Sequence, residues 1–149
     1  MYKASYQQQA YRQTEVETAN PGRILITLYD AAIRFVRLAM QQIDEGNIPA
    51  KGVTLGRAYA IIAEFIHALD HDRAPELCRN LEAIYNFMLE QMAESNSRMD
   101  KAPLMPVLQY LIDLRDTWSQ AVAIANKENG RGEAGNHIAP CQRDVQSFD

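Results

Sequence analysis

The sequence predicts an all-α fold: an antiparallel up-down-up-down four-helix bundle with an N-terminal arm and a disordered C-terminal tail. Apolar residues recur at spacings of three and four in four consecutive segments, which is the period of an amphipathic helix. Only a few residues join each segment to the next, and short connections favour antiparallel neighbours. No stretch alternates apolar and polar residues as a strand would. The expected divisions are an arm over residues 1–19, a bundle over 20–127 and a flexible tail over 128–149.

The first helix is expected over residues 21–45. Asn20 can cap the free amides of the first turn, and Pro21 lacks the amide that would be unsatisfied there. Gly46 and Asn47 provide the stop signal. The apolar stripe between these signals consists of Ile24, Leu28, Ala31, Phe35 and Leu38.

The second helix is expected over residues 51–70, because a polar run and Pro75 interrupt the pattern after it. Its stripe consists of Leu55, Ala58, Ile62, Phe65 and Leu69. The third helix is expected over 75–99, because proline suits the first position of a helix. Its stripe consists of Leu77, Leu81, Ile84, Met88 and Met92.

The fourth helix is expected over residues 101–127, with Asp100 as its potential cap. One face of this helix carries Leu111, Leu114, Trp118, Ala121 and Ala125. Because these residues share one face, we expect Trp118 to be buried in the bundle.

The two ends of the chain lack a helical period. Tyr11 and Val16 lie in a Gln-rich and Thr-rich stretch that is too polar to form its own core. We therefore expect a loosely held arm that docks on the bundle. From Glu128 onward the residues are mostly polar and show no period, which predicts a disordered tail.

Composition and charge exclude several classes of partner. The chain has 15 basic and 19 acidic residues and a net charge of −4, so it has no broad positive field for a nucleic acid or an anionic membrane. The polar N-terminus lacks the apolar centre of a signal peptide, and no apolar run approaches the roughly 18 residues of a membrane span. These features predict a cytoplasmic protein that neither binds nucleic acid nor inserts into a membrane. Cys78 and Cys141 are expected to be free thiols, as in a reducing compartment.

One group of residues has the spacing of a metal site. Glu64 and His67 are three residues apart, as in the carboxylate-histidine motifs of di-metal bundles, and His71 follows one turn later. Such a bundle needs a second Glu-x-x-His pair, yet the other three helices contain no histidine. We expect these residues to form a polar flank with no bound metal, and an incomplete metal-binding bundle remains an alternative.

Nothing in the sequence predicts catalysis or a cofactor. No nucleophile has a base at an informative spacing, there is no phosphate-binding glycine loop, and Cys78 lies among core-like neighbours. The chain is therefore expected to bind another protein rather than to act as an enzyme.

The apolar arcs of the second and third helices are wider than one bundle seam requires. Two interpretations are open: the helices pack deeply on two neighbours, or part of each arc forms a groove for an external segment. On the second interpretation, the partner-binding residues are Tyr11, Val16, Ile61, Phe65, Leu69, Leu81, Tyr85 and Met88.

The first helix and its entry resemble a known family. Residues 16–21, Val-Glu-Thr-Ala-Asn-Pro, and residues 28–35, Leu-Tyr-Asp-Ala-Ala-Ile-Arg-Phe, are similar to the opening of the flagellar export chaperones of the FliS family. The family pattern is a Val-x-Thr-Ala-Ser-Pro entry followed by Leu-Tyr-Asp-Gly-Ala-hydrophobic-Arg-Phe. The other matching positions are Leu69-Asp70, Asn80-Leu81, Tyr85, Asn96, Asp100 and Leu114-Arg115-Asp116-Thr117-Trp118.

Three departures from the family pattern accompany this resemblance. Asn20 and Ala31 replace a usual Ser and Gly, and both keep the local physics, since Asn caps as well as Ser and Ala favours a helix more than Gly. Residues 73–76, Arg-Ala-Pro-Glu, stand where a Gly-Gly-Glu is common. This third departure predicts a stiffer corner between the second and third helices.

The resemblance implies a cytoplasmic chaperone that binds the C-terminal segment of flagellin. It would prevent premature polymerisation and assist delivery to the flagellar type III export apparatus, with a component of the export gate as a further partner. The resemblance also implies that residues 1–19 act as a movable cap. A purely structural module that self-associates, for example as a homodimer, is the remaining alternative.

Overall fold

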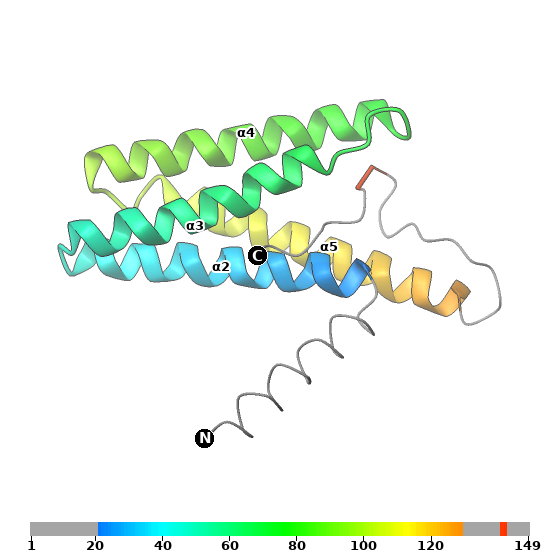
Figure 1. Ribbon diagram of the computed structural model, residues 1–149, viewed down its shortest axis with the longest axis horizontal. Coiled ribbons are helices and arrows are strands. Elements are labelled where there is room, and N and C mark those ends of the chain that lie inside the picture. The colour runs from blue at the N-terminus through cyan, green and yellow to red at the C-terminus, as the bar shows by residue number, and fades with distance from the viewer. Residues whose placement is uncertain (1–20, 130–140, 143–149) are drawn as a thin grey trace, which may run out of the picture.

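The computed structural model describes residues 21–129 and 141–142 of the chain (Figure 1). Four helices account for its regular structure: α2 (Pro21–Asp44), α3 (Ile48–His67), α4 (Pro75–Arg98) and α5 (Leu104–Asn129). Across these two ranges the only β-type pairing is an isolated antiparallel bridge between Leu69 and Gln142. The arm over 1–19 and most of the tail lie outside the described residues.

The four helices form the up-down-up-down bundle that the sequence predicts. Each helix packs on the next along the chain, and α5 returns to pack on α2 (Figure 1). The α2–α3 turn and the α4–α5 connection lie at one end of the bundle, and the α3–α4 corner lies at the other. None of the helices within the described ranges is long and apolar enough to cross a membrane.

Local capping determines where the helices begin and end. Asn47 accepts a hydrogen bond from the Ala50 amide (3.2 Å) and starts α3 at Ile48, three residues before the predicted start. The turn before it needs Gly46, which adopts the left-handed φ of +70° that favours glycine. The last helix begins at Leu104 rather than 101, because the Asp100 carboxylate accepts from the Ala102 amide (3.0 Å) and holds a turn there.

The core runs through the middle of all four helices. Its largest fully buried side chains are Tyr29, Tyr85, Phe65, Leu25, Ile62, Met88, Met92, Leu104 and Leu111. Trp118 is 5% exposed, which confirms its predicted burial. Burial of this kind supplies the main free energy that stabilises such a bundle.

Candidate functional site

A cluster of four buried aromatic side chains joins the four helices. It consists of Tyr29 on α2, Phe65 on α3, Tyr85 on α4 and Trp118 on α5. The hydroxyls of Tyr29 and Tyr85 are hydrogen-bonded at 2.6 Å, and the Trp118 indole N–H donates to the Tyr29 oxygen at 3.0 Å. The Phe65 ring stacks on Tyr29 with 4.4 Å between the ring centroids. Burial raises the pKa of both tyrosines well above the usual value, so both hydroxyls stay protonated at neutral pH. These polar contacts fix the register of the helices.

The structure places six of the predicted partner-binding residues in this core. Each of them is at most 6% exposed, and they are Ile61, Phe65, Leu69, Leu81, Tyr85 and Met88. The first interpretation of the wide apolar arcs therefore holds for these positions: α3 and α4 pack deeply on their neighbours. The other two, Tyr11 and Val16, lie outside the described residues. Partner contact by these eight residues stays a prediction, and for the six buried ones it would require the helices to separate.

Nine large apolar side chains of the described residues are exposed, among them Leu77 and Phe87 on α4 and Tyr110 on α5. These three are each between 37% and 41% exposed. The Phe87 and Tyr110 rings meet edge to face across the seam, with 6.0 Å between their centroids. We call these three residues the α4–α5 apolar surface. The partly buried Ile84 on α4 and Leu114 on α5 pack against the core beside it.

The packing between α4 and α5 explains why this surface is open. Of the four seams in the bundle, the one between α4 and α5 is the most sparsely packed. Figure 1 shows the first turns of α4 and the last turns of α5 well separated at the end of the bundle that carries the α3–α4 corner. The first turn of α4, which carries Leu77, therefore lies away from the last turns of α5.

This surface was not predicted from the sequence, because only one apolar stripe was considered on each helix. Leu77 was assigned to the core stripe of its helix, whereas Leu77, Ile84 and Phe87 form a second stripe at spacings of seven and three. The detectable signal was that α4 carries more apolar residues than one core-facing stripe can hold. Five of them bury fully: Cys78, Leu81, Tyr85, Met88 and Met92.

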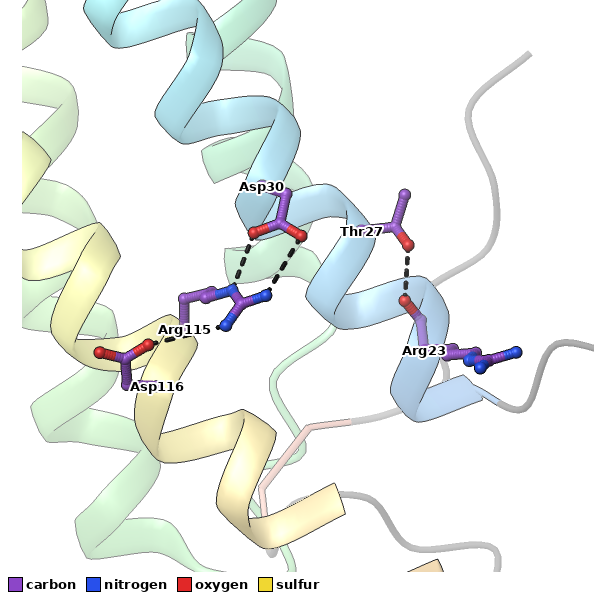
Figure 2. A network of polar contacts seen from close by, with 5 residues as sticks. All are labelled: Arg23, Thr27, Asp30, Arg115 and Asp116. Atoms are coloured by element: carbon purple, nitrogen blue, oxygen red, sulfur yellow. Dashed lines mark hydrogen bonds and ion pairs between the residues drawn. The ribbon is translucent and has the colours of Figure 1, made fainter. Parts of the chain in front are cut away.

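A partly exposed ion pair also joins α2 to α5. The Arg115 Nε atom donates to Asp30 Oδ1 at 2.8 Å, and a second guanidinium nitrogen lies 3.5 Å from Asp30 Oδ2 (Figure 2). Asp116 lies 3.7 Å from the same guanidinium. The hydrogen bond that Arg115 donates to Asp30 raises the pKa of the guanidinium, so this group stays charged. In the same view, Thr27 donates to the Arg23 carbonyl at 2.8 Å, a contact within α2.

The candidate metal residues lie near the end of α3 and just beyond it. His67 and His71 are exposed, and Glu64 is partly buried. The His71 Nε2 atom lies 3.3 Å from a Glu82 carboxylate oxygen, so its nearby acidic partner comes from α4 rather than from Glu64. No group of three His, Cys, Asp or Glu residues in ranges 21–129 and 141–142 is arranged to hold a metal ion.

Comparisons with known proteins identify the family of this chain. A family model described as flagellar protein FliS matches residues 2–125. The flagellar secretion chaperone FliS of Bacillus subtilis is 34% identical over 119 residues, which cover 80% of this chain and 88% of the relative. FliSB of Pseudomonas aeruginosa, also a flagellar secretion chaperone, is 31% identical and covers 74% and 88% of the two chains. FliS of Salmonella typhimurium is 29% identical and covers 82% and 94%. With a family match over most of its length and a relative 34% identical over 80% of it, the chain belongs to the FliS family of flagellar proteins.

Proposed function

We propose that this chain is a cytoplasmic export chaperone for flagellin. It binds the C-terminal segment of flagellin, prevents premature polymerisation and assists delivery to the flagellar type III export apparatus. Membership of the FliS family supports this proposal, and so do relatives that are named flagellar secretion chaperones. Delivery would add a second contact, with a component of the export gate. The proposal requires no catalytic step and no cofactor.

The observation that carries the proposal is the α4–α5 apolar surface. Two aromatic rings that meet across two helices, each more than a third exposed, are unusual on a surface unless something binds there, and Leu77 adds a further exposed apolar side chain on α4. Exposed aromatic residues are frequent centres of binding energy, because each one buries a large area for few rotatable bonds. The sparsely packed seam between α4 and α5 is suited to binding a helical segment that lies along it with its apolar face inward.

The chemistry of the cargo suits such a surface. A segment that polymerises through apolar helix faces is an aggregation hazard while those faces are exposed. Ordering this segment on binding costs conformational entropy, which offsets part of the gain from burial. The resulting affinity is moderate for the area covered, and a chaperone that must release its cargo needs that property.

The rigid core determines which side chains are available to the cargo. Tyr85 and Phe65 are 0% exposed and are held by stacking and hydrogen bonding, so the bundle can remain folded while cargo covers its outside. A charged substitution at Tyr85 would unfold the bundle and would not test binding. Variants on the α4–α5 apolar surface provide that test.

Calorimetric titration with flagellin tests the proposed function. We expect the full chain to bind full-length flagellin and to lose binding when the C-terminal segment of flagellin is removed. The isolated C-terminal segment should compete for the chaperone. Equal binding of the truncated and full-length flagellins would contradict the proposal.

A further inference from the structure

The corner between α3 and α4 brings together two buried cysteines that are 63 residues apart in the sequence. Cys78 lies in the first turn of α4, and Cys141 belongs to the short described segment 141–142. Both are 0% exposed, and neither is in a disulfide. Figure 1 shows segment 141–142 as a short red stretch beside this corner, at the open end of the bundle.

Segment 141–142 is docked by backbone and side-chain hydrogen bonds. The Asp70 amide donates to the Cys141 carbonyl at 2.6 Å, and Leu69 pairs with Gln142 in the isolated antiparallel bridge. The Gln142 side-chain amide donates to the Phe65 carbonyl at 3.1 Å. This carbonyl lies in the last turn of α3, where helix carbonyls lack intrahelical partners. The segment therefore caps the C-terminal end of α3.

The two thiols meet inside this docked arrangement. The Cys78 thiol donates to the Asp70 carbonyl at 3.2 Å and lies 3.6 Å from the Cys141 carbonyl. Burial raises the pKa of the Cys141 thiol to about 12, and a hydrogen bond with the Cys78 side chain adds to the rise. The docked Cys141 thiol is therefore protonated at neutral pH, and both thiols are shielded from solvent.

We propose that Cys78 and Cys141 are a dithiol–disulfide pair, and that their oxidation covalently fastens segment 141–142 to the α3–α4 corner. The oxidant is a low-molecular-weight disulfide such as oxidised glutathione. One protein thiolate attacks it, forms a mixed disulfide and releases one glutathione. The second protein thiolate then attacks the mixed disulfide and releases another glutathione. Two electrons pass from the protein sulfurs to the glutathione sulfurs, and the two protons end on the released glutathione thiols.

Docking controls both the rate and the equilibrium of this exchange. A docked thiol with a raised pKa supplies almost no thiolate, so the first attack requires local release of the segment. Once released, Cys141 regains an ordinary thiol pKa and can react. Re-docking then returns it to Cys78, which favours the internal disulfide over two separate mixed disulfides.

A glutathione titration of the full chain tests this inference. The protein is equilibrated at a series of oxidised-to-reduced glutathione ratios, blocked with a maleimide and digested with trypsin without reduction. We expect one disulfide that joins the peptide of residues 74–79 to the peptide of residues 132–143. Mixed glutathione disulfides, a linkage between two copies of the chain, or two free thiols at every ratio would each overturn the proposal.

Gln142→Ala provides the matched control, because it keeps both cysteines and removes one docking hydrogen bond. We expect the released state of segment 141–142 to become about three- to tenfold more populated, the fold-change that the loss of one such bond represents, so the first reaction with oxidised glutathione should accelerate by the same factor. An unchanged rate would mean that docking does not protect the pair, and would overturn that part of the proposal. Neither readout involves flagellin, so failure here is separate from failure of the proposed function.

Discussion

At the scale of single residues, Tyr29 has the most polar contacts in the buried cluster. Its oxygen accepts from the Trp118 indole and shares a hydrogen bond with the Tyr85 hydroxyl, while its ring stacks on Phe65. Tyr85 makes one of these two hydrogen bonds. Loss of the Tyr29 hydroxyl would therefore leave two buried groups to find new partners, whereas loss of the Tyr85 hydroxyl would leave one.

This difference predicts the order of two conservative variants. Tyr29→Phe should lower the free energy of unfolding by about 1–3 kcal/mol, because it removes the acceptor of a buried indole N–H. Tyr85→Phe should lower it by about 0.5–1.5 kcal/mol. Urea unfolding followed by circular dichroism gives both values.

The double variant is the control for this interpretation. Its cost should be smaller than the sum of the single costs, because the hydroxyls share a hydrogen bond. If Tyr85→Phe proves more costly than Tyr29→Phe, the assignment of Tyr29 as the central acceptor is incorrect.

At the scale of helices, sequence periodicity was sufficient to find all four elements but not all of their ends. The first and third helices were predicted within one residue at each end, because Pro21 and Pro75 mark their starts clearly. The second was predicted three residues late at both ends. Asn47 had been assigned to the end of the preceding helix, although it caps the following one. A capping residue between two helices can end the first helix or start the second, and only the three-dimensional structure shows which of the two it does.

Asn47→Ala tests this capping role. The variant should lower the free energy of unfolding by about 0.5–2 kcal/mol, because the Ala50 amide loses its side-chain acceptor at the start of α3. Asn47→Asp is the matched control and should retain most of the stability, since Asp caps about as well as Asn. Chemical denaturation of the three proteins measures the difference. A loss in Asn47→Asp as large as in Asn47→Ala would argue against capping as the cause.

At the scale of the whole molecule, the bundle could be predicted from the sequence, but the surface it presents could not. Periodicity placed Trp118 correctly, but it chose the wrong stripe on the first helix: none of the five predicted residues is fully buried, and Leu38 is 41% exposed. It does not show how closely two neighbouring helices approach, and the sparse packing of α4 on α5 exposes Leu77 and Phe87. The docking of Cys141 was equally hidden, because the residues around it have no period and its contacts lie at the distant α3–α4 corner.

The α4–α5 apolar surface leads to a prediction about the assembled complex. Phe87→Ser and Tyr110→Ser should each weaken flagellin binding by on the order of tenfold or more, as truncation of an aromatic residue at the centre of an interface does. Both side chains are more than a third exposed, so the bundle should stay folded while it loses the edge-to-face contact and the burial of the rest of the ring, on the order of 2 kcal/mol. Val53→Ser is the matched control, since Val53 is 60% exposed on α3 and is not part of this surface. Titration calorimetry and urea unfolding of all three variants separate binding from stability. If Val53→Ser weakens binding while Phe87→Ser and Tyr110→Ser do not, flagellin binds on α3 and the α4–α5 apolar surface has another role.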